Sequence, residues 1–336
     1  MYRPALRLLS SAPPECRVTL AVVAVPVSSA AVVVRGLTKS FGQVHAVRGV
    51  DLVIEPGTVF ALLGPNGAGK TTTVEIMEGF TERDAGEVRV LGLDPSTQRR
   101  AMLERVGIVL QETAVEQFLT VRETLARRTV YYPHPRDPLE VINLIGLEEK
   151  QDTRVRQLSG GQQRRLDLGL GLIGDPELLF LDEPTTGFDP NARREAWDVV
   201  RNLSSEGRTV LLTTHYMDEA QTLADQLAVI AKGVIIAAGT PESIGGRDTG
   251  EATVRFVVPD DVSIGELLGA QPGGEVKVTP EAKGQLVEIR TATPTSLLNR
   301  LTSWAVGRGD ELAGLEVTRP SLEDIYLRIT SEAEDS

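Results

Sequence analysis

The order of hydrophobic and polar positions predicts an alternation of strands and helices over most of the chain. Short apolar runs bounded by glycine or proline alternate with segments in which apolar residues recur every three or four positions. Such alternation is typical of an α/β domain with a mainly parallel sheet flanked by helices. The expected strands are 32–37, 44–54, 60–63, 87–91, 107–110, 178–181, 209–213, 227–230 and 234–238, and the expected helices are 70–78, 96–104, 162–173, 191–205 and 217–224.

One long segment interrupts this alternation. Between residues 112 and 156 no strand pattern is present, but apolar residues recur at helical spacing, at Val121 and Leu125 and again at Leu139, Ile142 and Ile145. The pattern therefore predicts a helical subdomain, at about 112–160, inserted into the α/β domain of residues 31–245.

The composition changes after residue 244, where Gly245, Gly246 and Gly250 indicate a linker. The following residues, 251–330, predict a small α+β accessory domain in the β-α-β-β-α-β order of a split βαβ unit. The residues 331–336 are expected to be an acidic tail. The expected strands are 253–258, 275–279, 285–290 and 314–318, and the expected helices are 262–268, 294–305 and 321–330.

The last of these helices carries one apolar stripe, because Leu322, Ile325, Tyr326 and Ile329 follow i, i+3, i+4 and i+7 spacing. Such a stripe must be buried against another element. We expect it to pack within the accessory domain, and the alternative is that it docks on the preceding α/β domain or on a second copy of the chain.

The first thirty residues permit two interpretations. No residue is charged from Val18 to Val34, a run of seventeen residues that approaches the length of a membrane span. It could be a signal sequence with a small-residue cleavage site at 28–30, or a dispensable leader joined to the first strand. Pro26 and Ser28 interrupt the run and residues 31–34 are needed for the strand, so we favour the leader.

Charge and cysteine content exclude several classes of protein. The 336 residues include 35 basic and 47 acidic side chains, and the net charge of −12 argues against binding to nucleic acid or directly to an anionic membrane surface. The single cysteine, Cys16, excludes a disulfide framework. Asp218 and Glu219 open a predicted helix, where we expect them to be solvated and favoured by the helix dipole.

The most informative glycine-rich stretch is VFALLGPNGAGKTT, from Val59 to Thr72. It reads as a buried strand, a glycine loop and the start of a helix, with the G-x-x-x-x-G-K-[ST] spacing of a phosphate-binding loop. Backbone N–H groups can turn inward around the phosphates, the lysine can reach the β- and γ-phosphates, and Thr71 can join the shell of Mg²⁺. The expected nucleotide-binding residues of this loop are Gly64, Asn66, Gly67, Gly69, Lys70, Thr71 and Thr72.

Two carboxylates end the strand of the sequence LLFLDE, from Leu178 to Glu183. A sheet that carries a phosphate-binding loop places its Mg²⁺-binding acid at such a strand end, next to a base that can orient the attacking water. We therefore expect Asp182 to hold the metal ion through water and Glu183 to be the base.

A second anion site is predicted by LSGGQ, at Leu158–Gln162, just before a helix. Ser159 supplies a hydroxyl, and the amides of Gly160 and Gly161 supply backbone donors at the helix N-terminus, without a lysine. Gln162 completes the motif. A chain with a phosphate-binding loop and a separate second phosphate-binding segment suggests a site built from two copies of the chain.

These motifs, in this order, resemble the ATP-binding subunit of an ABC transporter over residues 31 to about 240. The resemblance implies ATP as ligand with Mg²⁺, and a P-loop ATPase fold with an antiparallel β subdomain beside the helical one. It also implies that Gln111 senses Mg²⁺ and the membrane partner, that His215 contacts the γ-phosphate, that Asp189 crosses the dimer interface, and that Phe41 stacks on adenine. The family more often has tyrosine at this aromatic position and SGLD where this chain reads TGFD.

Within that family, the sequences GQQRRLDLGLGLIGDPELLFLDEP, THYMDEA and PSLEDIYLRIT resemble the exporters of the daunorubicin-resistance type. This resemblance implies a homodimer of ATPase subunits at the cytoplasmic face of the membrane. It further implies a separately encoded transmembrane permease that moves drugs or other hydrophobic natural products outward. Export of lipid, polysaccharide or sodium is an alternative.

A soluble ABC ATPase without a role in transport is the competing class. Translation factors of that class usually carry two ATPase halves, whereas this chain has one. Chromosome-maintenance members insert a long coiled coil, whereas only 94 positions separate Gly64 from Leu158.

Overall fold

The computed structural model describes residues 30–110, 115–246, 251–268, 274–281 and 284–334. The predicted leader, apart from residue 30, and Gln111 lie outside the described residues.

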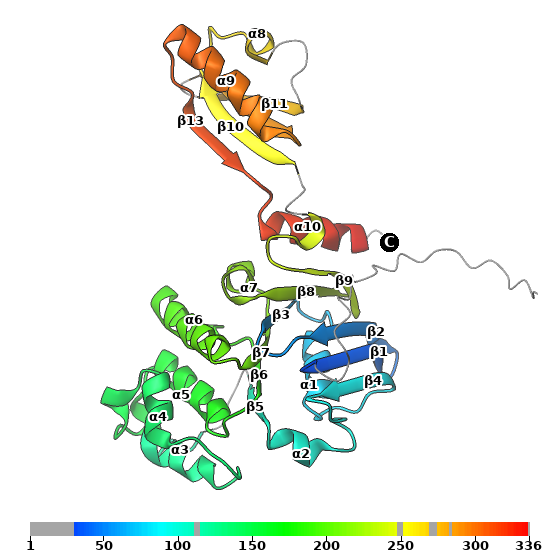
Figure 1. Ribbon diagram of the computed structural model, residues 1–336, viewed down its shortest axis with the longest axis vertical. Coiled ribbons are helices and arrows are strands. Elements are labelled where there is room, and N and C mark those ends of the chain that lie inside the picture. The colour runs from blue at the N-terminus through cyan, green and yellow to red at the C-terminus, as the bar shows by residue number, and fades with distance from the viewer. Residues whose placement is uncertain (1–29, 111–114, 247–250, 269–273, 282–283, 335–336) are drawn as a thin grey trace, which may run out of the picture.

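A six-stranded sheet forms the centre of the α/β domain (Figure 1), in the order β5-β6-β7-β3-β8-β9. The strands from β5 to β8 are parallel, and β9 runs antiparallel to β8. All five residues of β3 are buried, as expected of a strand covered on both faces. The strands are β3 (Val59–Leu63), β5 (Val106–Val109), β6 (Leu178–Asp182), β7 (Thr209–Thr214), β8 (Gln226–Ala231) and β9 (Val234–Gly239).

An antiparallel sheet and helix α1 pack on one face of the central sheet. Its order is β2-β1-β4, and its buried residues share a hydrophobic core with Phe60 and Leu62 of β3. The predicted helix at 96–104 is reduced to the shorter α2. The elements here are β1 (Val32–Phe41), β2 (Val44–Ile54), α1 (Lys70–Met77), β4 (Ala85–Val90) and α2 (Arg99–Leu103).

Helices cover the opposite face, where Ala61 and Leu63 of β3 join a second core. Thr120 caps α3 in a capping box with Glu123, and Asp137 caps α4 directly before Pro138, which explains where each helix begins. The elements are α3 (Val121–Thr129), α4 (Pro138–Leu144), η1 (Glu148–Lys150), η2 (Val155–Gln157), α5 (Gly160–Leu172), α6 (Pro190–Ser205) and α7 (Met217–Leu223).

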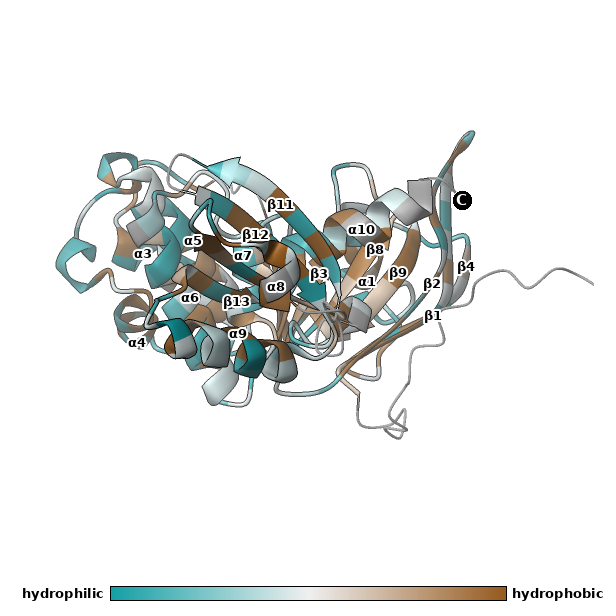
Figure 2. Ribbon diagram, turned by 90° about the horizontal axis from the view of Figure 1, so that it is seen from above, coloured by the Kyte–Doolittle hydropathy of each residue, from teal (hydrophilic) through white to brown (hydrophobic). Residues whose placement is uncertain are grey.

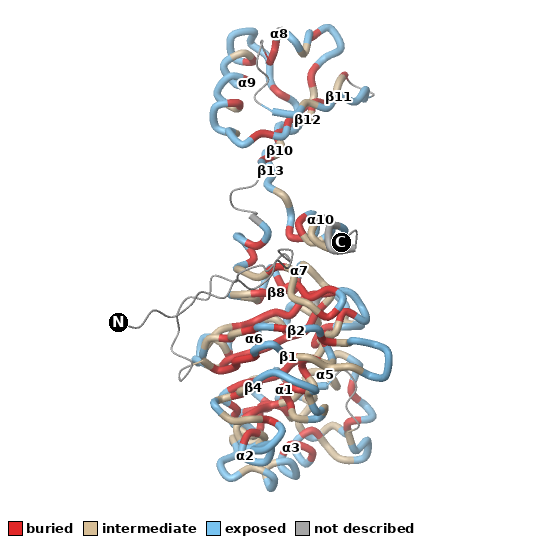
Figure 3. The backbone as a smooth tube through the Cα atoms, turned by 90° about the vertical axis from the view of Figure 1, so that its right-hand side faces the viewer, coloured by how far each residue is buried: buried red, intermediate tan, exposed pale blue. Residues whose placement is uncertain are grey.

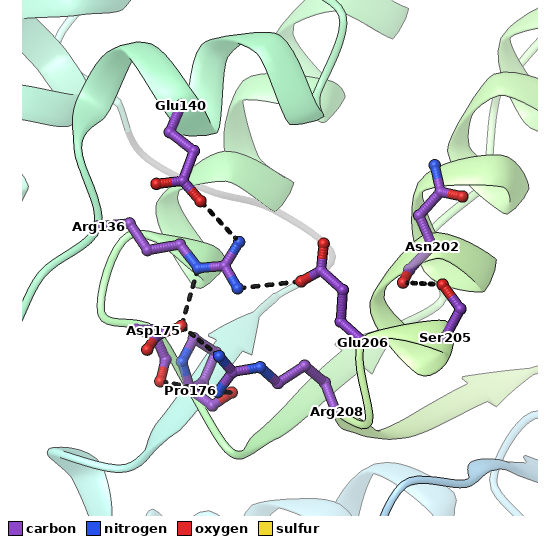
Figure 4. A network of polar contacts seen from close by, with 8 residues as sticks. All are labelled: Arg136, Glu140, Asp175, Pro176, Asn202, Ser205, Glu206 and Arg208. Atoms are coloured by element: carbon purple, nitrogen blue, oxygen red, sulfur yellow. Dashed lines mark hydrogen bonds and ion pairs between the residues drawn. The ribbon is translucent and has the colours of Figure 1, made fainter.

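A polar network fastens the helical subdomain to the central sheet (Figure 4). The Arg136 guanidinium, before α4, donates to Asp175 Oδ1 at 2.8 Å and to Glu206 Oε2 at 3.1 Å. Arg208 donates to the same Asp175 oxygen at 2.7 Å. Asp175 and Glu206 lie in the loops before β6 and β7. The network therefore connects the N-terminal ends of these two strands to the helical subdomain.

The accessory domain is one antiparallel sheet in the order β11-β12-β10-β13, joined by two helices. Its β-α-β-β-α-β sequence order is the predicted one. It has a hydrophobic core of its own that includes Phe256, Val287 and Leu301, and hydrophobic and hydrophilic residues both line α9 (Figure 2). The elements are β10 (Ala252–Val258), α8 (Ile264–Leu268), β11 (Glu275–Glu281), β12 (Gly284–Thr291), α9 (Pro294–Arg308) and β13 (Ala313–Thr318).

The final helix, α10 (Leu322–Glu334), does not pack within the accessory domain. Leu322 is 1% exposed and belongs to the hydrophobic core of the α/β domain, against which Tyr326 and Ile329 also pack. The helix contacts α7, β8, β9 and η3 (Ile244–Gly246) (Figure 3). The expectation of local packing is therefore wrong, and the predicted acidic tail is helical as far as Glu334.

None of the helices in the described part of the chain has the length and apolar character needed to cross a membrane.

Candidate nucleotide-binding site

Three neighbouring strands of the central sheet end at the same edge because they are parallel. β3 ends at Leu63 before the glycine loop, β6 ends at Asp182, and β7 ends at Thr214. This topology brings the glycine loop, Glu183 and His215 to one end of the sheet, although they are far apart in the sequence.

Lys70 lies inside the glycine loop. Its side chain is buried, and its ammonium group donates to the carbonyl oxygens of Gly64 at 2.7 Å and Pro65 at 3.1 Å. Burial lowers the pKa of Lys70, whereas the charges of Glu183 and Asp182 raise it. The loop thus holds a cation at its centre, next to two carboxylates.

The backbone of the loop requires glycine at two positions. A Cβ atom at Gly64 would lie 2.3 Å from the carbonyl oxygen of Ile230. At Gly69, whose φ is +103°, it would lie 2.4 Å from the carbonyl oxygen of Ala46. Asn66, Gly67 and Thr71 are exposed and Thr72 is half-buried, so the loop surface is open to a ligand.

The two carboxylates after β6 have different surroundings. Asp182 Oδ1 accepts a hydrogen bond from the Thr213 hydroxyl at 2.5 Å. Glu183 Oε1 lies 3.1 Å from His215 Nδ1, and Oε2 accepts from the Thr186 hydroxyl at 3.1 Å. The structure therefore brings Glu183 and His215 into direct contact, and a hydrogen bond forms when His215 Nδ1 carries a proton, because a carboxylate only accepts.

The donors at this edge fit a magnesium ion. The exposed Thr71 hydroxyl and the Asp182 carboxylate are oxygen ligands, which Mg²⁺ prefers, and Mg²⁺ usually takes few protein ligands beside phosphate oxygens and water. The described residues contain no cluster of three or more His, Cys, Asp or Glu side chains able to hold a metal.

The LSGGQ segment forms the start of α5. The Ser159 hydroxyl accepts from the Gln162 amide at 3.3 Å, and the Gln162 side chain accepts from the Ser159 amide at 3.0 Å, which makes a capping box. A Cβ atom at Gly160 would meet nothing within 4 Å, and one at Gly161 would lie 3.3 Å from Ala192 Cβ. Gly160 therefore faces open space, whereas Gly161 lies against Ala192.

Asp189 lies beside this surface. It is exposed, and its Oδ1 accepts from the backbone amide of Ala192 at 3.0 Å, close to the start of α6. The signature segment and the Asp189 loop consequently adjoin one another through Ala192.

Phe41 ends β1 and is 52% exposed. The Lys39 ammonium lies 5.2 Å from the centre of its ring, and the β1–β2 hairpin touches the glycine loop through Ala46. Gln111, the remaining predicted site residue, lies outside the described residues.

Glu219 is the clearest error of the sequence interpretation. It is 0% exposed rather than solvated, and it accepts from the Thr185 hydroxyl at 2.9 Å and from the Trp197 indole nitrogen at 3.2 Å. Burial raises its pKa, against the lowering effect of these hydrogen bonds. The i, i+4 spacing to Leu223, which is also buried, was the available signal.

Comparisons with known proteins identify the family of the chain. Residues 47–186 match the family described as ABC transporter, and residues 252–321 match the family described as ABC transporter domain-containing protein-like, C-terminal domain. The chain is 38% identical over 316 residues to the Nod factor export ATP-binding protein I of Rhizobium sp. (strain N33), covering 90% of this chain and 98% of that protein. It is 39% identical over 312 residues to the Daunorubicin resistance ATP-binding protein DrrA2 of Streptomyces coeruleorubidus, covering 89% of this chain and 95% of that protein.

Solved structures resemble the ATPase domain. The ADP conformation of MJ1267, an ATP-binding cassette of an ABC transporter, gives a TM-score of 0.58 at 26% identity and covers 64% of this chain and 92% of that one. The cbiO1 protein of Clostridium perfringens, part of the ABC transporter complex cbiONQ, gives a TM-score of 0.59 at 27% identity, covering 64% and 90%. From the ordered motifs, the shared fold and these relatives, the chain belongs to the ATP-binding proteins of ABC transporters, which are ATPases coupled to transport.

Proposed function

We propose that this chain is the ATP-hydrolysing subunit of an ABC exporter for drugs or other hydrophobic natural products. The observation that carries the proposal is the Glu183 carboxylate, held between His215 and Thr186 at the sheet edge that carries Lys70. A carboxylate fixed in this way can orient a water molecule for attack on the γ-phosphate.

The other residues bind and position the nucleotide. Lys70 and the loop amides would hold the phosphates, and Phe41 would stack on the adenine. Thr71 and Gln111 would hold Mg²⁺ directly, and Asp182 would hold it through water. Bound Mg²⁺ would neutralise phosphate charge during transfer. The proposed nucleotide-binding residues are Phe41, Gly64, Asn66, Gly67, Gly69, Lys70, Thr71, Thr72, Ser159, Gly160, Gly161, Gln162 and Asp189.

The open signature surface supports a homodimer driven by ATP. Ser159 and Gly160 are exposed, so the Ser159 hydroxyl and the Gly160 amide can donate hydrogen bonds to the phosphates of a nucleotide bound by a second copy. Asp189, which is exposed beside them, would cross the dimer interface. We propose 31–245 as the ATPase domain and 251–330 as an accessory domain whose last helix docks on it. The assembly would bind a separately encoded transmembrane permease at the cytoplasmic face of the membrane, peripherally.

Export as the direction of transport rests on the relatives. Their names describe daunorubicin resistance and Nod factor export, and they match nearly the whole chain, accessory domain included. These names are compatible with a drug-like molecule or another exported product as the transported compound.

The test is the variant Glu183→Gln. We expect ATP binding to persist and steady-state turnover to collapse, because the carboxylate orients water without an essential contact to bound ATP. ATP affinity and hydrolysis are measured on the same preparation. Turnover within about threefold of the parent would refute Glu183 as the base.

A further inference from the structure

The Arg164 side chain of α5 reaches under the turn that follows β6. Its Nη2 donates to the carbonyl oxygens of Asp182 at 3.0 Å and Glu183 at 3.4 Å, and its Nε donates to that of Pro184 at 3.2 Å. Its Nη1 donates to the carbonyl oxygen of Leu110. One guanidinium therefore holds three consecutive backbone carbonyls of the turn and the end of β5.

The turn held in this way is unfavourable in isolation. Glu183 has φ of +45°, a left-handed conformation that is unfavourable for a non-glycine residue and persists only when its surroundings impose it. Thr213 holds the same residue from the other side, through hydrogen bonds from the Glu183 amide to its carbonyl oxygen at 3.2 Å and its hydroxyl at 3.1 Å. Arg164 and Thr213 together fix the direction in which the Glu183 side chain leaves the backbone.

We propose that Arg164 is a positioning residue for ATP hydrolysis, acting through Glu183. The inference rests on the proposed role of Glu183 as the base. Because Arg164 lies five residues after Ser159, the N-cap of the same helix, it also connects the signature segment of one chain to the base of that chain. A shift of α5 against the sheet would consequently change the position of the carboxylate.

The contacts require arginine specifically. The guanidinium is planar and presents its N–H donors in fixed directions, whereas a lysine ammonium is a compact group with three donors. The side chain is 11% exposed, and its acidic neighbour, Asp167, lies 3.9 Å away. Lysine would keep the charge in this place but could not bond all the carbonyl groups at once.

The decisive experiment compares Arg164→Lys with Arg165→Lys in the full-length chain. Arg165 is the next residue of α5, but it donates to the Gly146 carbonyl and pairs with Glu195, away from the turn. We expect Arg164→Lys to lower kcat about tenfold or more, with KM for ATP within about twofold, because a small displacement of a reacting group is costly. The control variant should keep kcat within about twofold of the parent.

A double-mutant cycle separates positioning from a general loss of structure. If Arg164 acts through Glu183, then Arg164→Lys added to Glu183→Gln should not lower the residual single-turnover rate further. An equal fold-loss in both backgrounds would overturn the inference. So would an unchanged kcat in Arg164→Lys.

Stability controls complete the test. Arg136→Gln breaks the other attachment of the helical subdomain (Figure 4) and should lower the melting temperature while kcat of the folded protein stays normal. If Arg164→Lys does not fold, Arg164→Gln is measured in its place. Failure of both to fold, or a loss of rate that only follows the folded fraction, would show that Arg164 serves the fold and would overturn the inference. The Glu183→Gln variant alone tests the proposed function, so the two failures are distinguishable.

Discussion

Removing the Leu322 side chain tests whether α10 belongs to the ATPase domain. Leu322 is 1% exposed and lies in the same hydrophobic core as residues of α7, β8 and β9. The substitution Leu322→Ala leaves a cavity in that core, since the surrounding backbone comes from strands that cannot easily collapse inward. The accessory-domain core, which contains Phe256 and Leu301, should be untouched.

The expected cost follows from the complete burial. Leucine to alanine at a buried site costs about 2–5 kcal/mol. For a unit the size of the ATPase domain, each 1 kcal/mol lowers the melting temperature by about 2–4 °C. A loss of about 3 kcal/mol therefore predicts a decrease of about 6–12 °C in the transition of the ATPase domain.

Scanning calorimetry of the full-length chain measures this decrease. MgATP identifies the ATPase transition, because a ligand that binds only the folded domain raises its melting temperature. Leu327→Ala is the matched control, since Leu327 lies on the same helix but is 58% exposed. It should shift neither transition by more than about 1–2 °C.

Two results would refute the reasoning. A decrease confined to a transition that MgATP does not move would mean that α10 stabilises the accessory domain. No decrease in any transition would mean that the helix is not buried against the ATPase domain in solution.

Three further predictions follow from individual residues. In the Glu183→Gln background, Ser159→Arg should abolish ATP-driven dimerisation by placing bulk and charge in the phosphate cradle; monomers in both variants at saturating ATP, seen by sedimentation, would contradict the shared site. Burial, together with the charges of Asp182 and Glu75, raises the pKa of Glu78 from 4.5 to about 8. The folded chain then retains a proton that the unfolded chain releases, so its free energy of unfolding should fall between about pH 5 and 8, by up to about 1.4 kcal/mol per pH unit. Glu78→Gln should flatten this fall in nucleotide-free melts, and an unchanged pH profile would disprove the assignment. Glu219→Ala should cost about 2 kcal/mol, measured by urea unfolding, since it leaves the buried Thr185 hydroxyl and the part-buried Trp197 indole N–H without their acceptor; a loss under about 0.5 kcal/mol would contradict that role.

Local signals in the sequence predicted the elements that carry the motifs. Three elements are specified by residues within a few positions of one another. They are the buried strand before the glycine loop, the strand that ends at Asp182 and the helix that begins after Ser159. Alternation, capping and glycine placement act at that range, so the sequence alone indicated them. The split βαβ order of the accessory domain was predicted in the same way.

Contacts between distant segments were decided only by the tertiary structure. The apolar stripe on α10 has to be buried, but its spacing is compatible with packing on either domain. Only the tertiary structure shows that it packs on the core of the ATPase domain. Glutamate side chains are usually exposed to solvent, but Glu219 is buried because Thr185 and Trp197 donate hydrogen bonds to its carboxylate. Arg164 reaches carbonyl groups up to 54 positions away, and a backbone carbonyl has no signature in the sequence. A sequence specifies which groups must find partners, and the packing of the folded chain decides which partners they find.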